Sequence, residues 1–499
     1  MLDIQWTSDQ PQPAAGQVLA VPVRAEFEPD ALEARFGPGV RAALDAAKFK
    51  GKASTTFDFT RSHGDVLERV TLFGVGDGLD DPEALRQIGH DVVREAAKVG
   101  ATTIVLDLQA DTAAWNVGDD AERAGRLLAQ GLELGTYAYD RFLSEDNRKP
   151  SSVQSVTVWA DTTAPSEGTH AGQIIAAAVA RARDLANGPG ELVTPTFLAN
   201  AAKEIVDGAG DADVSLTVFD RAECEKRNMG CYLGVAKGSA EEPRFIHLTY
   251  KPKGTSKGRI VLIGKGVTFD SGGYSLKPTD GMLAMKLDMC GSAAVLGSFQ
   301  GLVALGVAYE VHVLVAATEN MIGGKAYRLG DILTASNGKT VEVNNTDAEG
   351  RLTMADALVY GSKLDPDIMI DFATLTGACI VALGPYIAGV MTDDERLATD
   401  WMSAADRTGE HMWRLPLQAK LKEQLRSPIA DMKNTGERWG GALTAGLFLS
   451  EFIEGKRWMH VDIAGPAMAN KAHGVTTAGG SGFPVPTILE FLSGDIQLG

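Results

Sequence analysis

Two short segments near the middle of the sequence combine carboxylates and lysines at a spacing that could do chemistry. The segment KGVTFDSGGYSLKP carries Lys265, Asp270 and Lys277, and Asp288 lies just beyond it in AMKLDMCGSA. A carboxylate can bind a metal ion or move a proton, and a lysine ammonium can stabilise negative charge that develops during a reaction. Taken singly, an Asp-Ser-Gly-Gly segment is typical of a turn, because Asp and Gly satisfy the backbone of loops.

Two further segments add similar residues later in the chain. VEVNNTDAEGRLTMADAL contains Asp347, Glu349 and Arg351, and DFATLTGA contains Thr374 and Gly377. Each also has a structural interpretation, since Asp-Ala-Glu-Gly is typical of a turn and an arginine can simply begin a helix. Four acidic residues, two lysines and one arginine nevertheless all lie at predicted strand or loop ends of one domain. This clustering favours a common site.

The residue types at this predicted site favour divalent metal ions. Several carboxylates that converge without cations would repel one another, and their pKa values would rise. Oxygen ligands suit divalent metals, and four carboxylates can hold two ions that share bridging oxygens. No histidine lies in the four segments, which disfavours a histidine-based zinc site. A two-metal centre polarises a carbonyl or phosphoryl group and activates water, so the residues indicate a two-metal hydrolase and leave peptides and phosphate esters both open.

Buried strands are predicted next to these segments. Four runs are almost continuously apolar, which is typical of strands covered on both faces: RIVLIG (259–264), EVHVLVAAT (310–318), DIMIDFAT (367–374) and WMHVDIAG (458–465). Helices are predicted between them at 293–306, 352–364 and 442–455. The expected fold is a mixed, largely parallel sheet flanked by helices, with ligands beyond the carboxyl ends of its strands.

A smaller α/β domain is predicted before this one. The first 160 residues alternate β-rich runs with helical stretches. The polar stretch DTTAPSEGTH (161–170) indicates a boundary, and the Ala-rich run that ends at NGPG predicts a linker helix near 172–187. We therefore expect an N-terminal α/β domain over residues 1–165, a linker helix over 166–194 and a catalytic α/β domain over 195–499.

The composition excludes several classes of protein. With 499 residues, 44% of them hydrophobic and 22% charged, the chain has the composition of a soluble globular protein of two or three domains. Its net charge of -18 argues against general binding to nucleic acid or anionic lipid. The four cysteines form no Cys-X-X-Cys pair and are expected to be reduced thiols. Because the N-terminus lacks the pattern of a signal peptide and no apolar run is long enough to span a membrane, we expect a cytoplasmic protein.

The segment NTDAEGRL (345–352) is identical to a signature of the leucyl aminopeptidase (cytosol aminopeptidase) family. Other blocks of that family resemble, in the same order, GKGVTFDSGGYSLKP (264–278), MKLDMCGSAAV (285–295), ATLTGA (373–378), GGALTAGLFLSEF (440–452) and WMHVDIAG (458–465). The resemblance covers roughly residues 180–499, while the first 165 residues carry no recognisable motif. It implies a metal-dependent aminopeptidase that removes leucine-like N-terminal residues from peptides and assembles as a homohexamer.

The same resemblance implies two metal ions, most often zinc, with manganese or magnesium able to replace one. Asp270 and Glu349 would bridge both ions, and Asp347 would complete the readily exchanged site. Lys265 and Asp288 would complete the tighter site. A lysine ligand must be a neutral amine, which requires neighbouring cations that lower its pKa.

Catalytic and substrate-binding roles are also implied by position. Lys277 would stabilise the oxyanion of the tetrahedral intermediate, and Arg351 would hold a bicarbonate ion that acts as general base. Met285, Thr374 and Gly377 would line the apolar pocket for the first side chain of the substrate.

Two alternatives remain open from the sequence. A two-metal phosphoesterase would use similar carboxylates but would need phosphate-binding groups beyond Arg351. A DNA-binding or regulatory role of the N-terminal domain would have to overcome the negative charge of the chain. Outside the predicted site, His460 lies in a predicted buried strand and is expected to be a core histidine, and Cys290, near Asp288, a core thiol.

Overall fold

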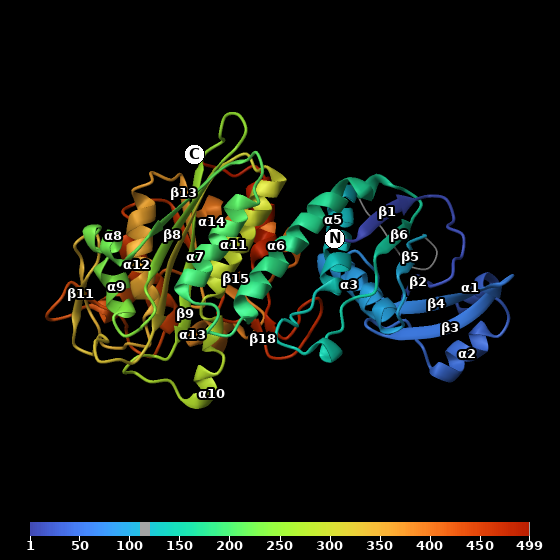
Figure 1. Cartoon of the computed structure of the whole chain (residues 1–499), viewed down its shortest axis with the longest axis horizontal. Coiled ribbons are helices and arrows are strands. Elements are labelled where there is room, and N and C mark those ends of the chain that lie inside the picture. The colour runs from blue at the N-terminus through green and yellow to red at the C-terminus, as the bar shows by residue number, and fades with distance from the viewer. Residues whose placement is uncertain (110–119, 499) are drawn as a thin grey trace. The chain divides into compact units, whose positions relative to one another are not determined.

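Figure 1 shows a computed structural model of the chain, which describes residues 1–109 and 120–498. The chain forms two compact units, one of residues 1–177 with 473–475 and one of residues 178–472 with 476–499. Each unit contains its own β-sheet together with helices. The expected fold class, an α/β protein of two domains, is confirmed.

The first unit is built on a six-stranded sheet in the order β1-β6-β5-β2-β4-β3. All neighbouring strands are parallel except β3, which is antiparallel to β4. The strands are β1 (Asp3–Thr7), β2 (Gln17–Val23), β3 (Thr56–His63), β4 (Val66–Gly74), β5 (Thr103–Asp107) and β6 (Ser155–Trp159).

Helices cover both faces of this sheet. One apolar cluster joins Val18 and Ala20 of β2 to α3 (Pro82–Lys98) and α5 (Ala121–Thr136). The alternate residues Leu19 and Val21 belong to a second cluster, with α1 (Pro29–Phe36) and α2 (Val40–Ala47). Because successive side chains of a strand point to opposite faces, the two helix pairs lie on opposite sides of the sheet.

The predicted linker helix is α6, which runs from Thr169 to Asn187 and so begins three residues before the predicted 172. Its interior is rich in alanine, the best helix former, and it ends where the NGPG segment follows. The chain passes from the first unit to the second within this helix, between residues 177 and 178.

The second unit is built on an eight-stranded sheet in the order β15-β14-β17-β13-β9-β10-β8-β7. Its four central strands β17, β13, β9 and β10 are parallel to one another, and antiparallel pairs occur toward both edges. The strands are β7 (Asp213–Phe219), β8 (Arg244–Lys251), β9 (Arg259–Asp270), β10 (Glu310–Asn320), β13 (Ile368–Ala373), β14 (Ala388–Met391), β15 (Met412–Arg414) and β17 (Trp458–Asp462).

Strand β9 is longer than the sequence predicts. The apolar run RIVLIG predicts a strand that ends at residue 264, followed by a loop, whereas β9 continues to Asp270. It pairs with β10 over this whole length, with one irregularity between Thr318 and Glu319. Lys265 and Asp270 are therefore held by strand backbone and not by a loop.

Helices cover both faces of the second sheet as well. A Cβ placed on Gly264 of β9 would touch Gly291 of α11 (Cys290–Leu305), whereas a Cβ placed on Gly361 of α12 (Gly350–Ser362) would touch Val261 and Ile263 of β9. The even and odd residues of β9 thus face α11 and α12 respectively. Two further helices contact strands of this sheet, α7 (Pro195–Asp207) and α14 (Glu395–Thr408). Outside them, α15 (Gly441–Leu449) packs against α12, and α16 (Val485–Ser493) packs against α11 and α14.

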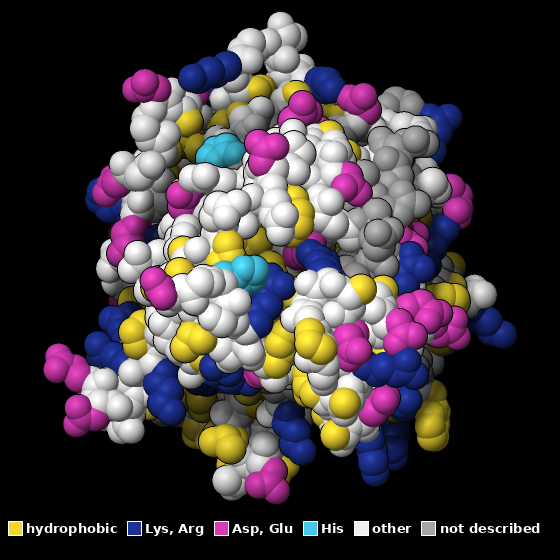
Figure 2. Space-filling view, turned by 90° about the vertical axis from the view of Figure 1, so that its right-hand side faces the viewer, with side chains coloured by type: hydrophobic (Ala, Val, Ile, Leu, Met, Phe, Trp, Pro, Cys, Tyr) yellow, Lys and Arg dark blue, Asp and Glu magenta, His cyan; other side chains and the backbone are white. Residues whose placement is uncertain are grey.

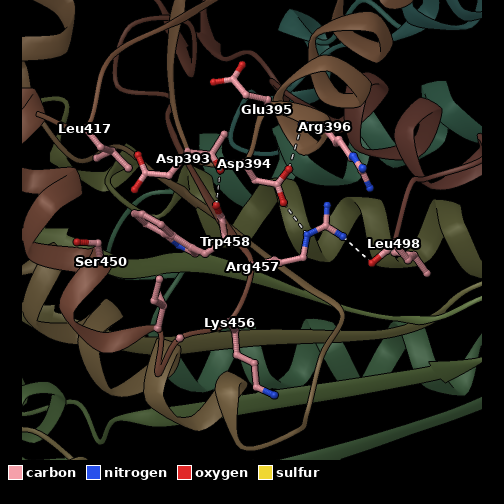
Figure 3. Close-up of a pocket in the computed structure, with 13 residues that line it drawn as sticks. Asp393, Asp394, Glu395, Arg396, Leu417, Ser450, Lys456, Arg457, Trp458 and Leu498 are labelled. Atoms are coloured by element: carbon pink, nitrogen blue, oxygen red, sulfur yellow. Dashed lines mark hydrogen bonds and ion pairs between the residues drawn. The ribbon is translucent and has the colours of Figure 1, made fainter.

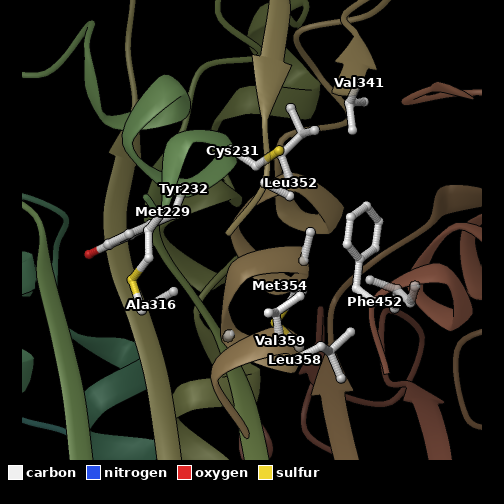
Figure 4. Packing of buried hydrophobic residues seen from close by; sticks show 14 of the residues in the cluster. Met229, Cys231, Tyr232, Ala316, Val341, Leu352, Met354, Leu358, Val359 and Phe452 are labelled. Carbon is white, nitrogen blue, oxygen red and sulfur yellow. The ribbon is translucent and has the colours of Figure 1, made fainter. Parts of the chain in front are cut away.

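The core on the α12 side is a large apolar cluster. Figure 4 shows Leu352, Met354 and Leu358 of α12 beside Tyr232 of α9 (Gly230–Ala236) and Ala316 of β10. The three α12 residues are fully buried. This packing fixes α12, whose first residues follow directly on one of the polar segments that the sequence singles out.

A small three-stranded sheet lies next to this core. It pairs β12 (Thr340–Glu342) with β11 (Ile332–Thr334) on one side and with β16 (Met432–Lys433) on the other. The turn that carries NTDAEG leads from β12 into α12.

One helical stretch of the described residues, Thr279–Leu305, has the length and mean hydropathy of a membrane-spanning segment. Within the protein, 83% of its most apolar window is buried. The burial identifies this stretch as part of the protein core.

Candidate metal centre

The polar residues of the predicted site come together beyond the carboxyl ends of the central parallel strands. Lys265 and Asp270 belong to the second half of β9, and Thr374 directly follows β13. Asp288 lies two residues before α11, at the end of the short 3-10 helix η3 (Met285–Leu287). Since β9 and β13 are parallel neighbours, their carboxyl ends bring these side chains to one edge of the sheet.

The turn between β12 and α12 adds Asp347 and Glu349. The backbone N–H of Asp347 donates to the side chain of Asn345 at 2.8 Å, and the hydroxyl of Thr346 donates to the carbonyl of Gly272 at 2.7 Å. The second bond ties this turn to the segment after β9. Gly272 has φ +85, and a Cβ there would lie 2.8 Å from Oδ1 of Asp347, so the close approach requires glycine.

Lys265 is buried between two carboxylates. Its Nζ lies 2.7 Å from Oδ1 of Asp288 and 2.9 Å from Oε1 of Glu349, and it donates to the carbonyl of Thr374 at 3.1 Å. The lysine side chain passes against Gly350, where a Cβ would lie 2.4 Å from its Cε. This contact explains why the residue after Glu349 has no side chain.

Lys277 is held in the same way by the other two carboxylates. Its Nζ lies 2.8 Å from Oδ2 of Asp270 and 2.6 Å from Oδ1 of Asp347. Its side chain is 17% exposed, compared with 4% for that of Lys265, so it lies closer to the solvent. The two lysines thus alternate with the four carboxylates in one compact group.

The donor atoms in this group fit a divalent metal. One carboxylate oxygen from each of Asp270, Asp347 and Glu349 lies within 4.8 Å of the others. In addition, Oδ2 of Asp288 and Oε2 of Glu349 are buried without a hydrogen-bond partner among the described residues. Buried carboxylate oxygens normally have partners, and an oxygen-rich set of this kind suits a hard or borderline cation. The residues present therefore fit the metal ions that the sequence predicts.

The pKa values of these carboxylates and lysines depend on their burial and on one another's charge. Burial raises the pKa of Asp270, Asp288 and Asp347, although the lysine ammonium groups oppose the rise. Burial by itself lowers the pKa of Lys265. The carboxylates of Asp288 and Glu349 raise this pKa by more than burial lowers it, so the net pKa lies above its usual value. With this pKa the lysine is an ammonium ion, and it could act as an amine ligand only if cations replaced its positive charge among the carboxylates.

Arg351 lies in the first turn of α12 and is 7% exposed. Its Nη1 donates to the carbonyl of Asn434 at 2.8 Å, while its Nε is buried without a partner among the described residues. Burial lowers the pKa of Arg351 to about 10, which still leaves it charged near neutral pH. A buried arginine with a free N–H is suited to binding a small anion.

The three predicted pocket residues have different surroundings. The hydroxyl of Thr374 donates to Oδ1 of Asp288 at 2.8 Å, so this residue touches the carboxylate group itself. Gly377 begins α13 (Gly377–Leu383), and a Cβ at this position would meet no atom within 4 Å. Met285 is half-buried in η3, three residues before Asp288.

Two asparagines that the sequence did not single out also contact the site. Asn320, at the end of β10, donates from Nδ2 to Oδ1 of Asp270 at 2.7 Å and to the carbonyl of Thr346 at 2.9 Å. Asn434 contacts the turn before α12. A polar residue at the end of a buried strand was the available signal for Asn320, whereas Asn434 lies outside every recognised block.

The residues expected to be structural are buried in the core. His460 is fully buried in β17, with its Nδ1 2.6 Å from Oδ1 of Asp371. Cys290 is 5% exposed, and burial raises the pKa of its thiol to about 12. Both predictions, a core histidine and a core thiol, are confirmed. Cys224, Cys231, Cys290 and Cys379 are all free and buried.

A cavity of about 630 Å³ lies at the opposite end of the same sheet (Figure 3). Its walls include Thr392, just after β14, and Trp458, the first residue of β17. Because β17 is parallel to β13 and β9, its first residue lies at the end away from the carboxylates. None of the predicted site residues lines this cavity, so it is separate from the candidate metal centre.

Comparison with known proteins identifies the family. Residues 180–489 match the family model described as the catalytic domain of the cytosol aminopeptidase family, and residues 18–146 match the model of its N-terminal domain. The chain belongs to the cytosol aminopeptidase family. Its N-terminal unit, in which the sequence predicts no motif, is thus part of the family's architecture as well. As a family member the chain is an aminopeptidase, and a metal-dependent one.

Named relatives and solved structures agree with the family models. A probable cytosol aminopeptidase of Cyanothece sp. is 41% identical over 505 residues, which cover 99% of this chain and 100% of the relative. A probable cytosol aminopeptidase of Acaryochloris marina is 44% identical over 459 residues, which cover 90% of each chain.

Among solved structures, a mutant of tomato leucine aminopeptidase has a TM-score of 0.89 and 35% identity, and the match covers 99% of this chain and 96% of the tomato chain. The bottromycin maturation enzyme BotP in complex with Mn has a TM-score of 0.84 and 33% identity, over 96% of this chain and 99% of that one.

Proposed function

We propose that this aminopeptidase binds two divalent metal ions through Lys265, Asp270, Asp288, Asp347 and Glu349, and that it removes leucine-like N-terminal residues from peptides. The observation that carries the proposal is the convergence of these five side chains at the carboxyl ends of β9 and β13. Asp270 and Glu349 would bridge both ions, and the closeness of their carboxylates supports this role, since one oxygen of each lies within 4.8 Å of the other. Asp347 would complete the readily exchanged site, and Lys265 and Asp288 would complete the tighter site.

The metal ions would supply the Lewis acidity that polarises the scissile carbonyl and activates water, and they would anchor the free α-amino group of the substrate. The structural relative BotP was solved in complex with Mn, which supports a divalent metal in this chain as well. We propose zinc as the usual ion, with manganese or magnesium able to occupy the exchangeable site.

Lys277 is the proposed oxyanion-stabilising group. Burial lowers its pKa, but the carboxylates of Asp270 and Asp347 raise it more, so the side chain carries a proton at neutral pH. Its position nearer the solvent than Lys265 allows it to reach a bound substrate. When the carbonyl carbon becomes tetrahedral, the ammonium donates a hydrogen bond to the oxygen that gains negative charge.

Arg351 is the proposed site for a bicarbonate ion that acts as general base. Its unpartnered buried Nε and its fixed Nη1 support this role. A planar guanidinium binds a carbonate-type anion through two parallel hydrogen bonds, which would hold the anion in one orientation for proton removal from water.

We assign the first side chain of the substrate to a pocket lined by Met285, Thr374 and Gly377. The absence of a side chain at Gly377 leaves space there, since no atom lies within 4 Å of where a Cβ would be. A Met in the wall suits branched apolar side chains, because its thioether adapts to irregular shapes. This supports a preference for leucine-like residues.

The proposed assembly is a homohexamer in the cytoplasm. Several large apolar side chains of the second unit are exposed in the single chain, among them Leu283 at 83%, Val381 at 89% and Trp439 at 74%. Where such side chains gather in one patch, they mark a surface that contacts other subunits, which a homohexamer would bury. The four free cysteines and the relatives named as cytosol aminopeptidases support the location.

We further propose that residues 195–499 form the catalytic domain and residues 1–165 a separate N-terminal domain joined by residues 166–194. The charge of the chain argues against a nucleic-acid-binding role for the N-terminal domain. On the face shown in Figure 2, acidic and basic side chains are interspersed, and the chain carries a net charge of -18.

The test compares three chromogenic substrates after metal removal by a chelator and restoration with Zn²⁺ or Mn²⁺: leucine p-nitroanilide, its N-acetylated form, and p-nitrophenyl phosphate. The proposal predicts metal-dependent cleavage of the free-amine substrate alone. Cleavage of the acetylated substrate at a similar rate would contradict anchoring of the α-amino group. Cleavage of the phosphate ester alone would identify a phosphoesterase.

A further inference from the structure

Asn434 is a fully buried polar residue that directly follows β16. It belongs to the segment ADMKNTG, which carries none of the proposed metal ligands. The side chain nevertheless faces the turn before α12, which carries Asp347 and Glu349. Because a buried amide destabilises the fold unless it is hydrogen-bonded, its partners indicate what it does.

Every polar atom of the Asn434 side chain is used on this turn. Its Oδ1 accepts from the backbone N–H groups of Asn344 at 3.0 Å and Asn345 at 3.3 Å. Its Nδ2 donates to the carbonyl of Asn345 at 2.6 Å and to the carbonyl of Ala348 at 3.4 Å. The bonded residues lie on either side of Asp347 along the chain, and Ala348 directly precedes Glu349.

The backbone of Asn434 extends the same contact in both directions. Its N–H donates to the carbonyl of Glu342, the last residue of β12, at 3.0 Å. Its carbonyl accepts from Nη1 of Arg351 at 2.8 Å. One residue thus contacts the end of β12, the ligand-bearing turn and the first turn of α12.

Few other side chains could make these contacts. The turn presents both N–H and carbonyl groups to position 434, so a donor and an acceptor must lie side by side at the end of a short side chain. Aspartate would turn an oxygen toward the carbonyls of Asn345 and Ala348. Alanine would leave all four backbone groups without the hydrogen bonds that the Asn434 amide makes to them.

We propose that Asn434 is a positioning residue of the metal centre. By holding the turn 344–348 in one conformation, it sets the positions of the Asp347 and Glu349 carboxylates, and its carbonyl orients Arg351. The inference rests on the metal-ligand roles proposed above for Asp347 and Glu349. Residues that orient metal ligands typically change metal affinity or activity by 10- to 100-fold when they are replaced.

The neighbouring residue offers a matched control. Thr435 donates from its N–H and its hydroxyl to Oδ1 of Asn344, at 3.1 Å and 2.8 Å, in an exposed position. These bonds join the same two segments at the start of the turn, but they reach only the side chain of Asn344 and not the backbone groups of the turn that Asn434 binds. Replacing the Thr435 side chain therefore shows how much the pairing of the two segments contributes by itself to metal binding and activity.

The experiment uses the full chain in three variants: Asn434→Asp, Asn434→Ala and Thr435→Val. For each we would measure Mn²⁺ bound per chain after dialysis, the Mn²⁺ concentration for half-maximal activation, kcat and KM for leucine p-nitroanilide, and the midpoint of thermal unfolding. Asn434→Asp keeps the oxygen that accepts from Asn344 and Asn345, so it removes mainly the two bonds that Nδ2 donates.

Both Asn434 variants are expected to need about 10- to 100-fold more Mn²⁺ for half-maximal activation and to have a lower kcat, with a smaller change in KM. Thr435→Val is expected to match the unchanged chain in Mn²⁺ requirement and kcat. Saturating Mn²⁺ should restore part of the lost activity, because the ligands are displaced and still present.

Three results would overturn the inference. One is a folded Asn434→Asp variant with unchanged Mn²⁺ requirement and kcat. Another is an equal loss in Asn434→Asp and Thr435→Val, which would assign the effect to weakened pairing of the two segments. The third is failure of both Asn434 variants to fold, since positioning predicts folded chains with displaced ligands. An unchanged chain that binds no metal would instead contradict the proposed function.

Discussion

At the scale of single residues, the two lysines of the proposed metal centre have different surroundings. Lys265 is enclosed by Asp288, Glu349 and the carbonyl of Thr374, whereas Lys277 lies nearer the solvent between Asp270 and Asp347. Enclosure suits a group that holds a metal. Partial exposure suits a group that meets the substrate.

Replacing Lys277 by methionine should lower kcat for leucine p-nitroanilide by about 10²- to 10³-fold, the cost typical of removing one oxyanion donor. Metal content measured by elemental analysis should stay the same, because Lys277 is not a proposed ligand. Lys325→Met, which changes an exposed lysine of the same unit, serves as control. An unchanged kcat in Lys277→Met would remove this lysine from the mechanism.

The sequence predicts the charged residues of the site better than the neutral ones. Carboxylates and lysines in Gly-rich segments are rare enough together to indicate a site, and NTDAEGRL identifies its chemistry through resemblance. Asn320 and Asn434 were not predicted, because an isolated asparagine in a sequence does not show which distant backbone groups it will face. Only the folded chain brings Asn434 to the carbonyls of Asn345 and Ala348.

At the scale of elements, the position of the site depends on β9 and α12. β9 carries Lys265 and Asp270 within its paired length, and α12 begins directly after Glu349. The sequence predicts both elements but ends the strand too early. Glycine, lysine and threonine interrupt its apolar run, and pairing with β10 outweighs their weaker strand preference.

Truncation of the α12 core should destabilise the second unit. Leu358 is fully buried in the apolar cluster, so Leu358→Ala should lower the free energy of unfolding by about 2–5 kcal/mol. Leu329→Ala, at a position 52% exposed, should change it by less than about 0.5 kcal/mol. Urea denaturation followed by circular dichroism measures both. Equal effects would contradict the packing of α12.

A hydrogen-bonded row of side chains connects β8, β10 and α12. Nδ1 of His247 lies 3.0 Å from the hydroxyl of Tyr360, and its Nε2 lies 2.9 Å from Nδ1 of His312, whose Nε2 contacts Glu310 at 2.9 Å. The hydroxyl of Thr249 lies 3.1 Å from Nδ1 of His312. Burial lowers the pKa of His247 to about 4, and the neighbouring His312 lowers it too.

This row predicts a loss of stability in acid. Because the pKa of His247 is lower in the folded chain than the usual value of about 6.5, the unfolded chain binds the proton first as the pH falls. The stabilisation by neutral His247 is therefore complete above about pH 6.5 and is lost progressively down to about pH 4, by on the order of 3 kcal/mol.

The measurement is the urea midpoint between pH 7 and pH 4 for the unchanged chain and for His247→Gln, which keeps a polar group but does not titrate. The midpoint should fall less steeply with acid in the variant. The carboxylates of the metal centre titrate in both proteins, so their effect cancels in the comparison. Identical slopes would contradict the account of His247.

At the scale of the whole molecule, the chain combines two compact α/β units, and the family models match a domain within each. The alternation of strand-like and helical runs predicts both units. The sequence does not predict what the first unit does, because its sheet and helices form a general α/β architecture and fold alone does not determine function.

Metal removal should lower the stability of the whole protein. An ion that binds only the folded chain at 100 times its dissociation constant stabilises it by about 2.7 kcal/mol. Chelation should therefore lower the thermal midpoint by roughly 5 °C, and Mn²⁺ or Zn²⁺ should restore it. Differential scanning fluorimetry with and without chelator measures this shift. The same midpoint in both conditions would contradict metal binding by the folded chain.

The central claim is that five side chains at the end of the parallel strands hold two metal ions, and counting the bound metal tests it most directly. Elemental analysis of the metal-saturated, gel-filtered protein should find two ions per chain, and Glu349→Ala, which removes a proposed bridging carboxylate, should lose metal together with activity. One ion or none in the unchanged chain would contradict the claim. Two ions still tightly held by Glu349→Ala would contradict the bridging role.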